Sequence, residues 1–179
     1  MTTTETTSAE EAPDSLAERV NNRSRRPSSD AFREFMGSQW GPRPDPGITR
    51  SAVADYLPAR ATAAGEPFSG ERLVIPAGSY KVRSNDCTYR FRAYSAFAHL
   101  SGLGQEREPD SVIVLEPLPE GGHEAVLYFK PRTSRSSQEF YTDSRYGEFW
   151  VGARPSLEEV SAETGLRCEH IDTLRDALA

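Results

Sequence analysis

Residues 112–129, VIVLEPLPEGGHEAVLYF, contain the strongest structural signal in this chain of 179 residues. The first four, residues 112–115, are consecutive apolar side chains, which is typical of a strand buried on both faces. A second apolar run, residues 125–129, follows the turn-forming pair Gly121 and Gly122. Two such runs on either side of a glycine turn predict a β-hairpin.

The N-terminal part of the chain changes character near residue 30. Residues 1–29 are rich in Thr, Ser and Glu and have almost no large apolar side chain, so they predict a disordered tail. Apolar residues then recur at helical spacing after Ser29 or Asp30, either of which can cap a short helix. Residues 41–47 contain three prolines and predict an extended connector. We expect a single folded domain over residues 30–179.

Helix and strand signals lie on both sides of the hairpin. Thr49 can cap a helix, which Pro58 should end or kink near Leu57 because proline lacks a backbone donor. The β-branched apolar run at residues 73–75 predicts a strand. Helices and strands therefore share one domain, which indicates the α/β class.

The C-terminal residues predict a helix, a strand and a final helix. Ser156 and Glu159 have the spacing of a capping box, and Gly165 should end the helix that they begin. Residues 168–171 predict a short strand, and Asp172 can cap the last helix. Because that helix has no stop signal, we interpret the fold as truncated at its C-terminus.

Charge and hydropathy exclude several classes of partner. The formal net charge is −6 and no long block of basic residues occurs, so we expect no nucleic-acid partner. The mean hydropathy is −0.63, and no stretch is long and apolar enough to cross a bilayer. The N-terminus lacks the basic start and apolar run of a signal peptide. We therefore expect a cytoplasmic protein with no membrane association.

The common catalytic and metal-binding motifs are incomplete in this sequence. His123 and Glu124 begin a zinc-protease pattern, but Leu127 stands where the second His is required. Gly102 begins a dinucleotide fingerprint, but Arg107 replaces its third Gly. Nucleophile-elbow and P-loop motifs are also missing. The residues alone thus predict no catalytic residue and no metal ligand in this chain.

Six segments, taken in order, give the sequence a family resemblance. They are RSND at 83–86, YRFR at 89–92, SAFAHLSGL at 95–103, EPDSVIVLEP at 108–117, EAVLYF at 124–129 and FWVGARP at 149–155. Together they resemble the N-terminal domain of Xaa-Pro aminopeptidase (aminopeptidase P), which is related to prolidase and creatinase. The resemblance covers about residues 30–179 and is closest to the actinobacterial form.

This resemblance implies a fold and a reaction. The implied fold is a ribonuclease-H-like mixed β-sheet flanked by helices. In the family, a separate pita-bread catalytic domain holds two Mn²⁺ ions per active site and hydrolyses the bond between an N-terminal residue and a following proline. Because the ligands of those ions lie in the domain that this chain lacks, we expect this chain alone to be inactive.

The resemblance also implies two substrate-binding residues and a set of partners. The domain would support a homo-oligomer, contact its own catalytic domain and wall the pocket of a neighbouring subunit. Trp150 matches a family Trp that reaches into that pocket, and Asp86 matches an Asp placed toward it. The residues alone favour a core or interface anchor for Trp150 and a turn residue for Asp86. The substrates would be peptides with proline at the second position.

Two other functions fit the residues. The chain could be a stand-alone, non-catalytic domain that binds a peptide or a protein through the association surface of the family. It could also be an unrelated enzyme that uses Asp86, His99 and Arg154. His99 lies between Phe97 and Leu100, which predicts a buried or half-buried histidine without a catalytic role.

Overall fold

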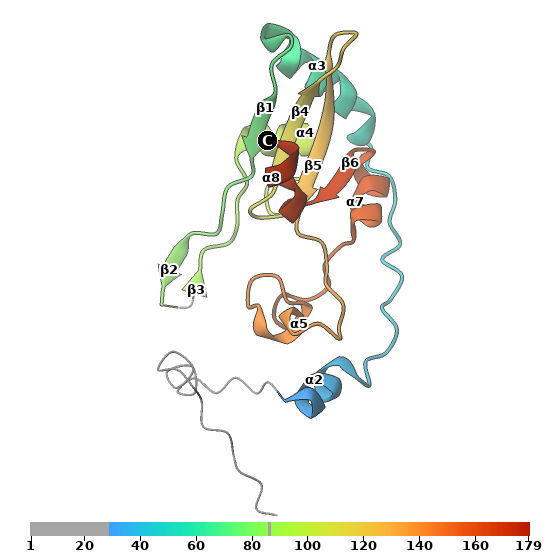
Figure 1. Ribbon diagram of the computed structural model, residues 1–179, viewed down its shortest axis with the longest axis vertical. Coiled ribbons are helices and arrows are strands. Elements are labelled where there is room, and N and C mark those ends of the chain that lie inside the picture. The colour runs from blue at the N-terminus through green and yellow to red at the C-terminus, as the bar shows by residue number, and fades with distance from the viewer. Residues whose placement is uncertain (1–28, 86) are drawn as a thin grey trace, which may run out of the picture.

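The computed structural model describes residues 29–85 and 87–179, and within them four strands form one mixed sheet (Figure 1). The strand order is β1 (Leu73–Pro76), β4 (Val112–Pro117), β5 (His123–Phe129) and β6 (Arg167–His170). The first three pair antiparallel, and β6 joins β5 in parallel. The predicted α/β fold with a mixed sheet is confirmed.

The predicted hairpin is the pair β4 and β5, which are hydrogen-bonded from the pair Val112 and Tyr128 to the pair Pro117 and His123. Side chains on both faces of these strands are fully buried, as a continuous apolar run predicts. Gly121 and Gly122 form the turn with φ of 94° and 83°, values that favour glycine.

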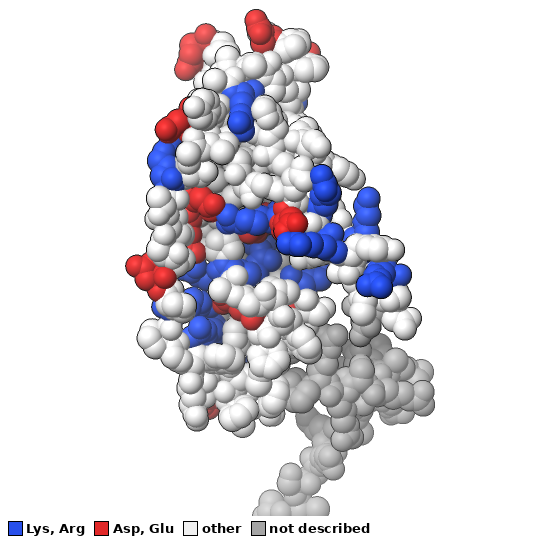
Figure 2. Space-filling view, turned by 180° about the vertical axis from the view of Figure 1, so that it is seen from behind, with Lys and Arg blue, Asp and Glu red and all other residues white. Residues whose placement is uncertain are grey.

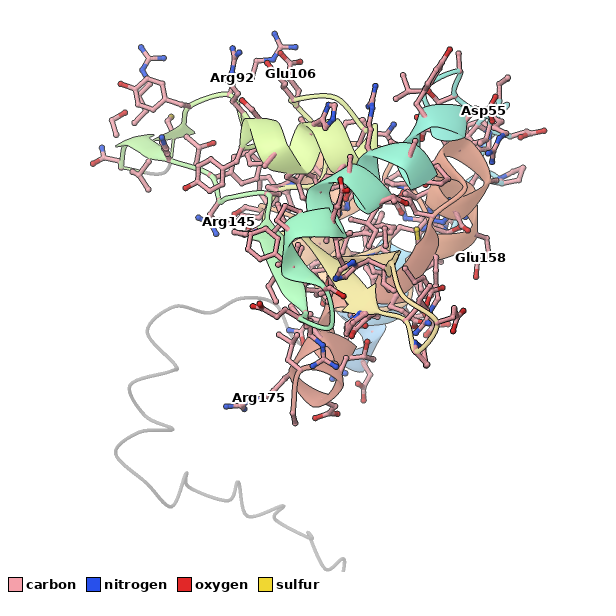
Figure 3. The ribbon with its side chains drawn as sticks, turned by 90° about the horizontal axis from the view of Figure 1, so that it is seen from above. Asp55, Arg92, Glu106, Arg145, Glu158 and Arg175 are labelled. Atoms are coloured by element: carbon pink, nitrogen blue, oxygen red, sulfur yellow. The ribbon has the colours of Figure 1, made fainter. Side chains whose placement is uncertain are left out.

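Helices cover the two faces of the sheet unequally. α3 (Leu57–Gly65), α4 (Ser95–Ser101) and α7 (Leu157–Thr164) pack on the larger face, where they bury the side chains of Leu57, Phe97, Val160, Ile113, Leu127 and Phe129. α8 (Leu174–Ala177) packs on the other face, against Val114 and Val126. Figure 3 shows the two sides, with Asp55 near α3 and Arg175 on α8.

The remaining helices and strands are short. They are α2 (Asp30–Gly37), α5 (Glu139–Thr142), α6 (Glu148–Val151), the strands β2 (Val82–Ser84) and β3 (Cys87–Thr88), and the 3-10 turns η1 (Ala54–Tyr56), η2 (Glu66–Phe68) and η3 (Ile171–Thr173). Ser29 caps α2 by accepting from the amide of Phe32, as predicted. Apart from Ser29, the predicted tail of residues 1–29 lies outside the described residues. None of the helices described here has the length and apolar character needed to span a bilayer.

The predicted break near Leu57 is wrong. Pro58 lies in the first turn of α3, where a helix needs no backbone donor, so proline begins this helix and does not end it. The preceding turn starts at Ala54, and Thr49 does not cap it. Pro58 therefore lies at a helix boundary, as predicted, but at the start of a helix and not at its end.

The C-terminal elements are close to the prediction. Ser156 and Glu159 form the capping box, and Gly165 ends α7 in the left-handed conformation with φ of 74°. β6 begins and ends one residue earlier than predicted. The cap by Asp172 is wrong, because the ring of His170 accepts from the amide of Asp172 at 3.1 Å and so caps η3.

The burial of β5 can be tested with two matched substitutions. Val126→Ala removes a fully buried side chain and should lower the free energy of unfolding by about 2–3 kcal/mol. Val74→Ala removes the same atoms from a side chain that is 47% exposed on β1, and should cost less than about 1 kcal/mol. Urea denaturation measures both, and equal losses would contradict the burial of β5 on both faces.

Candidate functional site

A cluster of aromatic rings lies where the N-terminal segment meets α5 and α6. We call the rings of Trp40, Phe140, Phe149 and Trp150 the aromatic platform. The ring centroid of Trp40 lies 5.3 Å from that of Phe140, and the ring centroid of Phe149 lies 5.6 Å from that of Trp150, both edge to face. Such pairs fix ring orientation in addition to burying area.

Trp150 lies on the surface of this platform. Its side chain is 59% exposed, so it is not a core residue. Its ring nitrogen donates to the carbonyl of Tyr141 at 2.6 Å, which fixes the plane of the exposed indole.

Two glycines flank the short helix α6, which carries Trp150. A Cβ on Gly147 would lie 2.6 Å from the carbonyl oxygens of Phe140 and Asp143, and Gly152 has φ of 82°.

The N-terminal connector stabilises α6 through Glu148. The side chain of Glu148 is 8% exposed and forms an ion pair with Arg43 of the connector. Its other carboxylate oxygen accepts from the backbone amide of Arg154 at 3.1 Å. The sequence of residues 41–47 predicts only a connector. The Trp40 that precedes them was the one local signal that the segment packs against the domain.

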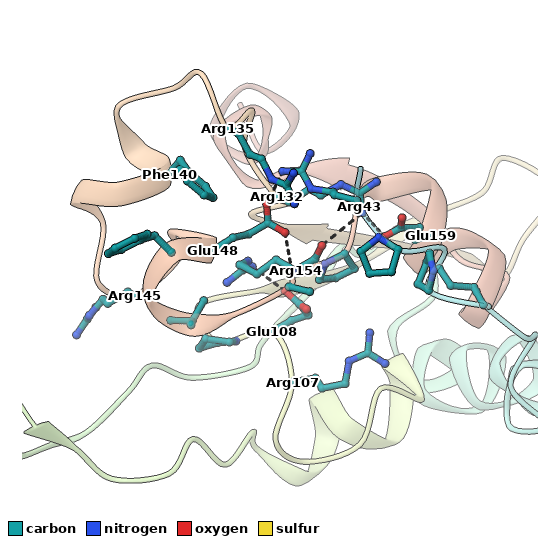
Figure 4. Close-up of a pocket in the computed structure, with 18 of the residues that line it drawn as sticks. Arg43, Arg107, Glu108, Arg132, Arg135, Phe140, Arg145, Glu148, Arg154 and Glu159 are labelled. Atoms are coloured by element: carbon teal, nitrogen blue, oxygen red, sulfur yellow. Dashed lines mark hydrogen bonds and ion pairs between the residues drawn. The ribbon is translucent and has the colours of Figure 1, made fainter. Parts of the chain in front are cut away.

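A groove of about 680 Å³ lies beside the platform (Figure 4). Its charged lining residues are Arg43, Glu106, Arg107, Glu108, Arg132, Arg135, Arg145, Glu148, Arg154, Glu159 and Glu163. Figure 2 shows basic and acidic side chains gathering across the middle of the face turned away from the view of Figure 1. Apolar rings, including those of Trp40 and Phe149, complete the lining.

A buried ion pair forms part of the groove. The side chains of Arg154 and Glu108 are 9% and 6% exposed, and their nitrogen and oxygen lie 3.1 Å apart. Arg154 also donates to the carbonyl of Lys130 at 2.6 Å and lies 4.9 Å from the ring centroid of Tyr146. Burial raises the pKa of Glu108, and the Arg154 guanidinium acts against that shift. The pair is therefore a structural element that joins two loops.

The loop around Glu108 has an uncommon backbone. Glu108 and Asp110 have φ of 53° and 61°, which is unfavourable for residues with a Cβ. Arg154 holds the first carboxylate, and the hydroxyl of Tyr146 donates to the second. Burial and this bond raise the pKa of Tyr146, so its hydroxyl remains protonated and donating. These side-chain contacts offset the backbone strain.

The sequence profile described as aminopeptidase P, N-terminal domain, matches residues 56–179. This chain belongs to that family. It is 41% identical over 145 residues to Xaa-Pro aminopeptidase 2 of Streptomyces coelicolor, covering 81% of this chain and 30% of the relative. It is 42% identical over 151 residues to Xaa-Pro aminopeptidase 1 of the same organism, covering 84% and 30%. The family resemblance stated from the six segments is confirmed.

A solved structure has the same fold. Aminopeptidase P from E. coli in a low-pH form superposes with a TM-score of 0.55 at 23% identity, covering 70% of this chain and 26% of that one. This similarity supports the aminopeptidase P fold. The chain spans about 30% of the length of the Streptomyces relatives.

Of the two predicted site residues of this aminopeptidase P domain, the structure describes Trp150 and not Asp86. Trp150 is exposed on the platform, whereas Asp86 lies outside the described residues. His99 is exposed on α4, so the predicted burial or half-burial is wrong, and it does not line the groove that contains Arg154. His99 and Arg154 therefore share no cavity among the described residues, although an unrelated enzyme that used both would need one.

The residues of this domain do not fit a metal ion. Across residues 29–85 and 87–179, no three His, Cys, Asp or Glu side chains gather in a way that could hold one. The Mn²⁺ ions implied by the family resemblance thus have no ligand set among the described residues.

The buried pair predicts a pH-dependent loss of stability. Arg154→Gln should lower the free energy of unfolding by about 3–5 kcal/mol at neutral pH, because it leaves the Glu108 carboxylate buried without its partner. The pKa of Glu108 is raised by burial and would rise further. A carboxyl group with a raised pKa in the folded state contributes stability at low pH, and that contribution is lost as the pH rises through the folded value.

Urea denaturation across the acidic to neutral range measures this effect. The difference between Arg154→Gln and the double variant with Glu108→Gln should grow as the pH rises. Arg72→Gln is the matched control, because its partner Glu116 is more exposed and is not among the groups that shift the pKa of Glu108, and its loss should cost about 1 kcal/mol or less. A pH-independent difference would show that Glu108 is not the group left unpaired.

The role of Trp40 in fixing Trp150 can be tested by fluorescence. Trp40 and Trp150 are the two tryptophans of the chain, so replacing Trp40 leaves Trp150 as its single indole. Trp40→Ala removes the ring packed on Phe140 and Phe149 and should lower the fluorescence anisotropy of Trp150. Trp40→Phe keeps an edge-to-face ring and should preserve it. Equal anisotropies would mean that Trp40 does not hold the platform.

Proposed function

We propose that this chain is the N-terminal domain of a manganese-dependent Xaa-Pro aminopeptidase that releases an N-terminal residue preceding proline. Membership of the aminopeptidase P family supports this, as do relatives named Xaa-Pro aminopeptidase. In the proposal, the metal ligands belong to a separate catalytic domain of the polypeptide. The domain itself spans residues 30–179, and the protein works in the cytoplasm.

In this proposal the domain supports a homo-oligomer and walls the substrate pocket of a neighbouring subunit. The observation that carries this role is the exposed indole of Trp150, fixed by its bond to Tyr141 and by the platform. A flat apolar ring of fixed orientation suits a proline ring, which has no side-chain donor to recognise. Asp86 would place a carboxylate near the ammonium group of the peptide.

Complementation between an impaired variant and an inactive variant tests the proposal. The first variant of the complete polypeptide carries Trp150→Ala, which should lower kcat/KM for an Xaa-Pro peptide about tenfold, while Trp150→Phe should retain most of it. The second variant lacks one metal ligand of the catalytic domain. Mixed oligomers should regain activity, because each intact metal site then receives Trp150 from its neighbour.

Three outcomes would contradict parts of this proposal. Mixed oligomers that form without regaining activity would show that Trp150 does not serve a neighbouring site. Turnover by the 179-residue chain alone with Mn²⁺ would refute a separate catalytic domain. Absence of Xaa-Pro turnover by the complete polypeptide would favour a stand-alone binding domain. Light scattering on the same samples reports whether the oligomers form.

A further inference from the structure

The groove beside the aromatic platform has more positive charge than its own carboxylates neutralise. Four of its six arginines have a glutamate partner within the groove, in the pairs Arg43 with Glu148, Arg107 with Glu163, Arg132 with Glu159 and Arg154 with Glu108. The fifth glutamate, Glu106, pairs with Arg90, which does not line the groove. Within the described residues, Arg135 and Arg145 therefore have no carboxylate partner.

These two guanidinium groups are held by contacts that leave their charge uncompensated. Arg135 donates to the carbonyl of Gly41 at 2.5 Å and lies 5.4 Å from the ring centroid of Trp40. Arg145 lies 5.9 Å from the ring centroid of Tyr80. A guanidinium has five N–H donors, so each arginine keeps donors for a carboxylate. Ring contacts also limit the rotamer entropy that binding would cost.

The two arginines are spaced along the groove. In Figure 4, Arg135 lies beside Arg132 and Arg43, whereas Arg145 lies apart from them beyond Glu148. A single small anion would engage one of these positions. An extended chain that carries several carboxylates can engage both.

The walls of the groove suit a peptide. They include Pro44, Pro46, Pro109 and Pro155 together with the rings of Trp40, Tyr80 and Phe149. Proline has no backbone donor, so these walls offer apolar area with few competing hydrogen bonds. Aromatic-lined grooves bind extended, proline-containing segments, and arginine clusters bind acidic ones.

From these observations we propose that the groove is a docking site for an extended acidic peptide segment of a partner protein. Carboxylates of the segment pair with Arg135 and Arg145, and its apolar or proline residues lie against the rings and prolines of the wall. The pairing uses arginines whose loss leaves no buried glutamate unpaired. This docking does not depend on the aminopeptidase reaction proposed above.

A binding assay on the chain tests the docking site. The probe is a short fluorescein-labelled peptide of repeated Glu-Pro units, followed by anisotropy, and a Gln-Pro peptide of equal length is its matched control. The Glu-Pro peptide should bind, and the Gln-Pro peptide should not. Binding should weaken as the salt concentration rises, because the paired groups are partly exposed.

Substitutions locate the binding on the molecule. Arg135→Gln and Arg145→Gln should each weaken binding of the Glu-Pro peptide about tenfold, the effect of one charge-assisted hydrogen bond. Arg175→Gln makes the same charge change on α8, outside the groove, and should leave binding unchanged. Arg135→Lys keeps the charge and checks that a loss is not due to misfolding, as does urea denaturation of every variant.

Several outcomes would overturn the proposal. Equal binding of the Gln-Pro peptide would show that carboxylates are not recognised, and equal weakening by Arg175→Gln would show a general charge effect. Full displacement by inorganic phosphate at low concentration would indicate a small-anion site. Loss of binding in the complete polypeptide would show that another part of the same protein covers the groove.

Discussion

Burial of the β4–β5 hairpin on both faces is the constraint on which the rest of the fold depends. Ile113, Leu115 and Leu127 point to one face, and Val114 and Val126 point to the other. Neither face can remain in water without losing the main favourable contribution to folding. The chain must therefore supply cover on two sides, with α3, α4 and α7 on one and α8 on the other. The face on which each helix lies therefore follows from the buried side chains of the strands.

The same hairpin determines where the site lies. The chain leaves β5 after Phe129, forms α5 and α6, and returns to α7 beside its point of departure. The amide of Arg132 donates to the carbonyl of Pro155 at 2.9 Å, and Arg154 donates to the carbonyl of Lys130. The two ends of this excursion are thus clamped together next to the sheet. Trp150 is fixed because the segment that carries it is closed at its base.

The helices and strands that could be predicted from the sequence are those with local signals. β4 and β5 were visible because both of their faces are buried, and α7 was visible because Ser156 and Glu159 lie within one turn. The prediction failed at Pro58, because a proline can lie at the start or at the end of a helix and the pattern alone does not say which. The site was less accessible. Trp150 was found only through the family resemblance, and Arg43 pairs with Glu148 across 105 residues, a contact that no local pattern contains.

The net charge of the chain does not describe the local charge of its groove. A chain with a formal charge of −6 has a groove in which two arginines lack a carboxylate within the described residues. Partner choice depends on this local field, which is focused between low-dielectric walls. Nucleic-acid binding draws much of its affinity from contacts of Lys and Arg with many phosphates, and each contact steepens the salt dependence. Two cations set among proline and aromatic rings offer too few such contacts, so the groove suits a short acidic peptide better than a nucleic acid.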